Sequence, residues 1–145
     1  IEALFHVGRF RSEEKAILAR TYELLEMFRL EPFAGELAEN LPYGLQRKLE
    51  IIRALASQPR LLLLDEPAAG MNPAEIEDLM SFILGIQKDF GLTILLIEHQ
   101  MRVVMGLCER IVVLDFGATI AEGGPLEIQR HPKVLEAYLG MEDVT

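Results

Sequence analysis

The residues of this sequence best suited to catalytic chemistry stand in two pairs, Asp65–Glu66 and Glu98–His99. Each pair directly follows an apolar run, Leu61–Leu64 for the first and Thr93–Ile97 for the second. Short continuous apolar runs are typical of strands that are covered on both faces. Ligands of open parallel sheets bind outside the carboxyl ends of the strands. We therefore expect three carboxylates and one imidazole to share one edge of a parallel sheet.

Adjacent carboxylates at a strand end suit Mg²⁺, a hard cation that prefers oxygen ligands and often accompanies phosphates. One acid can hold the metal ion or its water, while the other orients or deprotonates an attacking water. A nearby histidine can contact a phosphate oxygen or the same water. Two alternatives stay open. The acids of Asp65–Glu66 can form a solvated rim or helix cap, or they can serve a hydrolase of another class. A lone histidine after a strand is usually structural.

Helix signals precede and separate the two apolar runs. Ser12 can cap an early helix. Between the runs, Asn72 can cap a second helix, and Pro73 suits its first turn. Glu75 stands three residues after the cap, which is the capping-box spacing, and Gly91 ends the helical pattern. The pattern predicts a helix that connects the two strands.

Strands and helices alternate in the second part of the chain, which predicts an α/β fold with a parallel sheet flanked by helices. Further strands are expected at Arg110–Asp115 and Ala118–Gly123, joined by a hairpin turn. The earlier part is mainly helical, with one helix predicted over Leu45–Ser57. We therefore expect a helical subdomain over residues 1–58 and a sheet-containing part over residues 59–145.

Composition argues against a general nucleic-acid binder. The 145 residues carry a formal net charge of −9, whereas binding to a phosphate backbone requires a surplus of Lys and Arg. The single cysteine, Cys108, cannot form an internal disulfide and is expected to lie in the core.

Four stretches, in this order and at this spacing, resemble the motifs of ABC-type ATPases. They correspond to the signature motif with its following helix, the Walker B motif, the D-loop and the strand before the switch histidine. In sequence they are LPYGLQRKLEIIRALASQP (Leu41–Pro59), LLLLDEP (Leu61–Pro67), AGMNP (with Gly70–Pro73 at its core) and TILLIEHQM (Thr93–Met101). More narrowly, these stretches and AEGGP…AYLG resemble the ATPase subunits of branched-chain amino acid importers, although urea and other polar-solute importers carry similar subunits.

The resemblance implies part of a P-loop NTPase fold, with ATP and Mg²⁺ as cofactors. By position, Asp65 would be the acid on the Mg²⁺ side, acting through water. Glu66 would polarise the attacking water, and His99 would contact the γ-phosphate.

The signature motif implies a second set of nucleotide contacts. Tyr43, Gly44 and Gln46 would lie at the start of a helix, where backbone N–H groups favour an anion. In the family this loop presses on ATP bound by the opposite subunit of a head-to-tail dimer. Asn72 would take part through the D-loop.

The sequence departs from the family pattern by substitutions in two motifs and by one absence. In the signature motif, Tyr43 stands where the first glycine is usual and Leu45 where the first glutamine is usual. Pro42 replaces the signature serine and has neither a hydroxyl nor an N–H group, and Asn72 replaces the D-loop aspartate. No G-x-x-x-x-G-K-[ST] motif occurs in the chain. We therefore expect the chain to be the C-terminal portion of an ABC ATPase and to be inactive by itself.

The resemblance implies an ATPase subunit that drives import of a polar solute, with branched-chain amino acids favoured. Its partners would be transmembrane permease subunits and a second ATPase subunit, which places it in the cytoplasm, peripheral to the inner face of the membrane. Two rival hypotheses remain: a P-loop ATPase of DNA repair, which the acidic balance disfavours, and a non-catalytic remnant that binds a partner.

Overall fold

The structure is a computed structural model that describes the backbone of residues 2–139 and the side chains of residues 12–137. It divides into two compact units, the first ending at Leu62 and the second beginning at Leu63. Each unit is described by itself below. Among the described residues, no helix is both long enough and apolar enough to cross a membrane.

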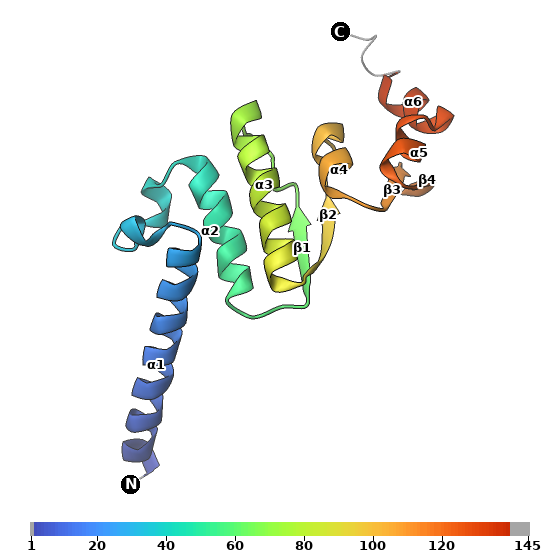
Figure 1. Cartoon of the computed structure of the whole chain (residues 1–145). Helices are drawn as coiled ribbons and strands as arrows, with labels where there is room; N and C mark the ends of the chain where they lie inside the picture. The colour runs from blue at the N-terminus through green and yellow to red at the C-terminus, as the bar shows by residue number, and fades with distance from the viewer. Residues whose placement is uncertain (1, 140–145) are drawn as a thin grey trace. The chain divides into compact units, whose positions relative to one another are not determined.

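The first unit is helical (Figure 1). Helix α1 runs through Ser12, so the predicted cap at that residue is wrong. The residues before Ser12 also adopt helical geometry, and a serine is tolerated inside a helix at small cost. Leu24 of this helix is buried as a core residue, whereas Ile17 is 67% exposed. The elements are α1 (Glu2–Met27), η1 (Glu31–Phe33), η2 (Ala38–Asn40) and α2 (Tyr43–Leu55).

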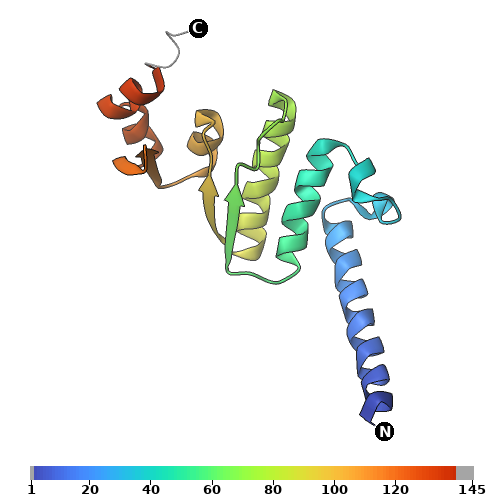
Figure 2. The same cartoon turned by 180° about the vertical axis from the view of Figure 1, so that it is seen from behind.

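The second unit contains the predicted alternation of strands and helices. In Figures 1 and 2 the arrows of its first two strands lie side by side and point the same way, as a parallel pair does. The division between the units falls within β1 (Leu61–Asp65), which is described here with its partner strand. The other elements are α3 (Pro73–Phe90), β2 (Thr93–Ile97), α4 (Met101–Leu107), β3 (Ile111–Asp115), β4 (Ala118–Gly123), α5 (Pro125–Gln129) and α6 (Pro132–Leu139).

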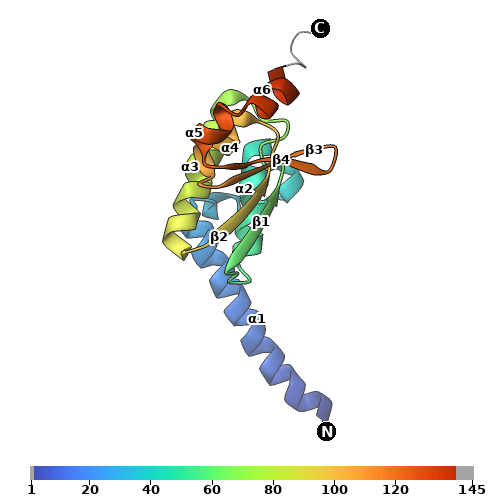
Figure 3. The same cartoon turned by 90° about the vertical axis from the view of Figure 1, so that its right-hand side faces the viewer.

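The strands of the parallel pair are covered on one face, which corrects the expectation of two covered faces. Leu62 and Leu64 are buried, whereas Leu63 of the same strand is 65% exposed. On β2, Leu95 and Ile97 are likewise more than half exposed. Figure 3 shows helix α3 on one side of β1 and β2. An apolar strand sequence predicts that both faces of the strand are buried. In the described part of the chain, side chains pack against one face of β1 and β2 only.

Helix α3 begins and ends as its sequence predicts. The side chain of Asn72 accepts hydrogen bonds from the N–H groups of Ala74 and Glu75, at 3.0 and 3.1 Å. The carboxylate of Glu75 accepts from the N–H of Asn72 at 2.9 Å, which completes the capping box. At the other end Gly91 adopts left-handed geometry with φ of 60°. These caps fix where the connection from β1 enters α3.

The third strand pairs with its successor rather than with the parallel pair. Strands β3 and β4 form an antiparallel hairpin with Asp115 opposite Ala118. The two turn residues, Phe116 and Gly117, have φ of 44° and 78°, the positive values that a type I′ turn requires. The hairpin turn predicted here is confirmed. Among the described strands, β1 pairs only with β2 and β3 only with β4.

A hydrophobic cluster holds the hairpin to the helices of its own unit. The cluster consists of Ile111, Val113, Ala121, Ile128 and Val134, with Cys108 packed against it. Burial raises the pKa of the Cys108 thiol. A thiol of raised pKa is a weak nucleophile at neutral pH. Cys108 was expected in the core, and the structure places it partly buried at the edge of this cluster.

Candidate functional site

The carboxyl ends of β1 and β2 meet at one edge of the parallel pair. The backbone N–H of Glu66 donates to the carbonyl oxygen of Ile97 at 2.9 Å. This bond joins the first residue after β1 to the last residue of β2. The backbones of the two strand ends therefore meet at one edge, as the sequence predicts.

At this edge the imidazole of His99 faces the carboxylate of Glu66. The Nδ1 atom of His99 lies 3.3 Å from Oε1 of Glu66, and the two side chains are 63% and 52% exposed. A pair this exposed contributes at most about 1 kcal/mol to stability. Its exposure instead leaves both groups accessible to water and to a phosphate-bearing ligand.

The backbone of Glu66 has an uncommon conformation. Its φ is 43°, in the left-handed region that costs a residue with a β-carbon about 1–2 kcal/mol. The turn that follows is closed by two backbone bonds, from Ala69 to the carbonyl of Glu66 at 3.1 Å and from Met71 to that of Ala68 at 3.2 Å. Strain of this kind is concentrated at functional sites. The sequence carried no signal for it.

Glu98 does not share the open edge with the other acids, which corrects the expectation of three carboxylates on one rim. Its side chain is 0% exposed. Its oxygens accept from the backbone N–H groups of Ala68, His99 and Gln100, at 3.1, 3.0 and 3.2 Å. A buried carboxylate needs such donors, and the turn after β1 supplies one of them. Glu98 therefore faces the backbone rather than a ligand.

Asp65 is exposed at the end of β1, where an oxygen ligand for a cation is expected. Among the residues whose side chains are described, no group of three or more His, Cys, Asp or Glu could hold a metal ion. Mg²⁺ does not require such a group, because it keeps several waters and is often held by one or two carboxylates together with phosphates. The exposed carboxylates of Asp65 and Glu66 fit that kind of binding.

The signature segment lies in the first unit, at the beginning of α2. Helix α2 starts at Tyr43, so Tyr43, Gly44 and Gln46 all occupy its first turn, as predicted. The amide of Gln46 donates to the carbonyl oxygen of Leu41 at 2.7 Å. This bond fixes the loop before the helix and also turns the amide nitrogen of Gln46 towards the protein.

Tyr43 belongs to a small polar cluster on α2. Its hydroxyl accepts from Nε and Nη2 of Arg47, at 3.0 and 2.6 Å. Arg47 also forms an ion pair with Glu50 at 2.8 Å. The hydrogen bond to Glu50, followed by that to Tyr43, raises the pKa of the Arg47 guanidinium. Arg47 was not among the predicted site residues, although its spacing of four residues from Tyr43 is the spacing of neighbours on a helix.

Asn72, predicted to contact nucleotide through the D-loop, uses its side-chain oxygen in the cap of α3. This role accounts for an asparagine at the position, since asparagine is among the preferred capping residues.

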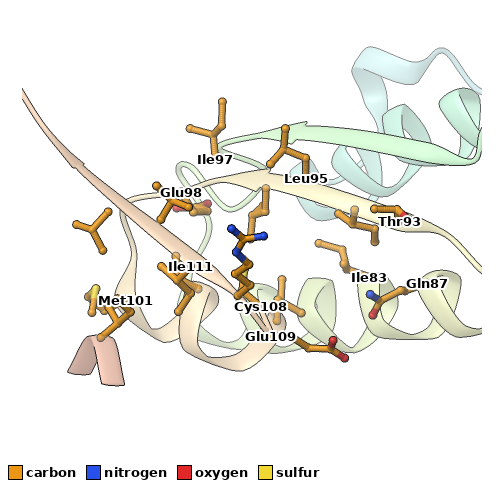
Figure 4. Close-up of a pocket in the computed structure, with 18 of the residues that line it drawn as sticks. Ile83, Gln87, Thr93, Leu95, Ile97, Glu98, Met101, Cys108, Glu109 and Ile111 are labelled. Carbon is orange, nitrogen blue, oxygen red and sulfur yellow. The ribbon is translucent and has the colours of Figure 1, made fainter. Parts of the chain in front are cut away.

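A cavity of about 680 Å³ separates β2 from β3 (Figure 4). It is lined by apolar side chains such as Leu95 and Ile111, and Glu98 lies at the end of β2 beside Ile97. Nothing in the sequence predicted a space here, because the alternating pattern of strands gives no information on which strands are neighbours.

Comparisons with known proteins identify the chain's relatives. The profile of the family described as "ABC transporter" matches residues 3–69. The profile described as "Branched-chain amino acid ATP-binding cassette transporter" matches residues 118–143.

Two curated relatives carry the same kind of name. The chain is 43% identical over 140 residues to the high-affinity branched-chain amino acid transport ATP-binding protein BraF of Pseudomonas aeruginosa, covering 97% of this chain and 55% of that protein. It is 45% identical over 137 residues to the corresponding protein LivG of Escherichia coli, covering 94% and 54%. The chain thus spans about half the length of the curated relatives it matches.

The fold is shared with a solved structure. The ADP conformation of MJ1267, an ATP-binding cassette of an ABC transporter, superposes with a TM-score of 0.79 at 30% identity, covering 86% of this chain and 50% of that one. The ordered motifs, the fold and these relatives together place the chain in the family of ABC transporter ATP-binding proteins.

Proposed function

We propose that the chain carries the water-activating edge of an ATPase that drives solute import through an ABC transporter. The contact between Nδ1 of His99 and Oε1 of Glu66, 3.3 Å apart, is the observation that carries the proposal. It supports the proposal because Glu66 would be the base, His99 would bind phosphate, and ligands of parallel sheets bind at this edge of the strands.

Each side chain of this edge has a role that follows from its position. Glu66 orients and polarises the attacking water, and its strained backbone holds the carboxylate at the strand end. An imidazole that donates from Nδ1 to Glu66 presents Nε2 on its other side, where a protonated ring can donate to a phosphate oxygen. Asp65 would hold Mg²⁺ through water, and the ion would supply neutralisation of phosphate charge.

The first turn of α2 serves a second nucleotide in the proposed assembly. Helix N-termini favour anions, and Tyr43, Gly44 and Gln46 occupy this turn. In a head-to-tail dimer this turn would meet ATP held by the partner ATPase subunit. Asn72, at the start of α3, would lie near the same nucleotide.

The transported solute is proposed to be a branched-chain amino acid, because BraF and LivG carry that substrate in their names. The complete protein would then work with transmembrane permease subunits. It would lie in the cytoplasm against the inner face of the membrane, which it would contact only through the permease.

A chimaera tests the proposal. This chain replaces the matching 137-residue segment of Escherichia coli LivG, to which it is 45% identical. We expect the chimaera to hydrolyse ATP in the presence of Mg²⁺ and to restore leucine uptake to cells that lack LivG. The 145-residue chain alone should show no turnover, because it contains no G-x-x-x-x-G-K-[ST] loop.

The outcomes separate the parts of the proposal. A folded chimaera that binds ATP but never hydrolyses it would contradict the ATPase function. Hydrolysis without leucine uptake would support the ATPase function and contradict the proposed identity of the solute. Turnover by the purified 145-residue chain would contradict the expected need for a phosphate-binding loop.

A further inference from the structure

We propose that Glu98 is a positioning residue that ties the turn after β1 to the segment after β2, so that Glu66 and His99 face each other. The inference rests on the proposed function of that pair, whereas the hydrogen bonds of Glu98 are made to backbone groups. Figure 4 shows Glu98 at the end of β2. Its side chain is fully buried, whereas that of the neighbouring His99 is 63% exposed.

The carboxylate of Glu98 bridges two segments that are thirty residues apart in sequence. Its Oε1 accepts from the N–H of Ala68 at 3.1 Å. Its Oε2 accepts from the N–H groups of His99 and Gln100, at 3.0 and 3.2 Å. Three donors converge on two oxygens, which suits a group that accepts hydrogen bonds and donates none.

A second bond closes the bridge into a ring. The side-chain amide of Gln100 donates to the carbonyl oxygen of Ala68 at 3.3 Å. The residue Ala68 is 0% exposed, so water cannot replace either partner. Ala68 is thus held from its N–H side by Glu98 and from its carbonyl side by Gln100.

The positions of these residues explain why the bridge acts on the site. Ala68 lies two residues after Glu66, and His99 directly follows Glu98. The bridge therefore fixes the backbone on both sides of the 3.3 Å contact between Glu66 and His99. The three hydrogen bonds of the Glu98 carboxylate all go to backbone N–H groups. Its Oε2 also lies 3.8 Å from Nδ1 of His99, so the carboxylate contacts the imidazole as well as the backbone that carries it.

Two other glutamates accept backbone N–H groups but have only local partners. Glu75 accepts from Asn72 at 2.9 Å, and Glu127 accepts from Gly124 at 2.9 Å, each three residues away in a helix cap. Glu98 alone of these three joins segments from different strands. Glu75 therefore offers a matched control, in which a carboxylate that caps backbone is changed without affecting the proposed bridge.

The first test is hydrogen–deuterium exchange of the 145-residue chain, resolved to single amides, for the variants Glu98→Gln and Glu75→Gln. Glutamine has nearly the same shape as glutamate, but one carboxylate oxygen becomes an NH₂ group, which cannot accept a hydrogen bond from the backbone N–H groups. We expect Glu98→Gln to speed exchange about tenfold or more at Ala68, His99 and Gln100, relative to amides in α3. Glu75→Gln should leave these three amides unchanged and affect the start of α3.

A purely structural role would instead speed exchange throughout the unit, which overturns the proposal. Unchanged exchange at Ala68 would also overturn it. If Glu98→Gln does not fold, Gln100→Ala removes only the bond to the Ala68 carbonyl. It should still raise exchange selectively at the turn after β1, and uniform or unchanged exchange would count against the bridge.

The second test measures whether the bridge governs the site. The ¹⁵N chemical shifts of the His99 imidazole are measured in four proteins: the unaltered chain, Glu66→Gln, Glu98→Gln and the double variant. The effect of Glu66→Gln is thus obtained once with Glu98 present and once with Glu98 replaced. We expect Glu66→Gln to shift the Nδ1 signal in the unaltered chain and to have less than half that effect when Glu98 is replaced. An equal effect in both backgrounds would show that Glu98 does not position the pair. This readout does not depend on ATP hydrolysis, so its failure is distinguishable from failure of the proposed function.

Discussion

Two strand ends in this molecule are nearly identical in sequence pattern and differ in their surroundings. Strands β1 and β3 are each five residues long and end in aspartate, at Asp65 and Asp115. The residue after each strand has left-handed geometry, with φ of 43° at Glu66 and 44° at Phe116. The same left-handed backbone conformation therefore follows both strands.

What differs is the partner strand. Strand β1 is followed by a long connection to a parallel neighbour, so that its end meets the end of β2 and brings Glu66 to His99. Strand β3 turns back at once into β4, so that Phe116 projects from a hairpin and is fully exposed. An acid after an apolar strand becomes a candidate site only where a second strand ends beside it.

The largest expected effect comes from replacing Glu66, the acid that follows β1, in the chimaera. Asp115, the acid that ends β3, serves as the comparison. Glu66→Gln should lower the rate of ATP hydrolysis about 10²–10⁴-fold, the usual contribution of a general base. Asp115→Asn, at the end of the matching strand, should leave the rate within about twofold, a change below 0.5 kcal/mol. Steady-state hydrolysis measures both. Similar losses in the two variants would remove the distinction between the strand ends.

The second largest expected effect is self-association of the 145-residue chain. Leu63, Leu95 and Ile97 form an exposed apolar face on the parallel pair, 65%, 58% and 59% exposed. Such faces and unpaired strands associate. We expect oligomers in sedimentation analysis and a shift towards monomer for Leu95→Lys. Phe116→Ser, which removes one isolated exposed ring, should change little. A monodisperse monomer of the unaltered chain would count against this expectation.

The sequence predicted the local elements of this fold well, because local chemistry determines them. Asn72 and Glu75 form the predicted capping box, and Thr93–Ile97 is the second strand as predicted. Features that depend on distant residues could not be predicted. The exposure of Leu63 depends on which faces receive a helix, and the burial of Glu98 depends on the turn at Ala68, thirty residues away. Residue types at the site were visible in the sequence, but their orientation was not.

A smaller effect concerns the left-handed residue itself. Asparagine tolerates this geometry better than phenylalanine or glutamate. Phe116→Asn creates the Asn-Gly pair that type I′ turns prefer and should stabilise the chain by about 1 kcal/mol. Glu66→Asn should stabilise by a similar amount while abolishing hydrolysis in the chimaera. Urea midpoints and hydrolysis rates test both. Loss of stability at both positions would show that the positive φ is not strained.

The smallest effect concerns Cys108, beside the hairpin cluster. Burial raises the pKa of its thiol, so the folded state keeps the proton to higher pH than the unfolded state does. The free energy of unfolding should therefore be unaffected at neutral pH and fall as pH rises above about 8.5, where the unfolded thiol ionises. Alkylation at pH 8 should be slower than for a denatured control. Equal alkylation rates would contradict a structural role for Cys108.

The proposed ATPase function depends on the contact between Glu66 and His99, which a crystal structure of the chimaera would reveal. We expect Nδ1 of His99 within hydrogen-bonding reach of Oε1 of Glu66, near the 3.3 Å of this structure. An imidazole turned away from the carboxylate, with the two strand ends separated, would contradict it.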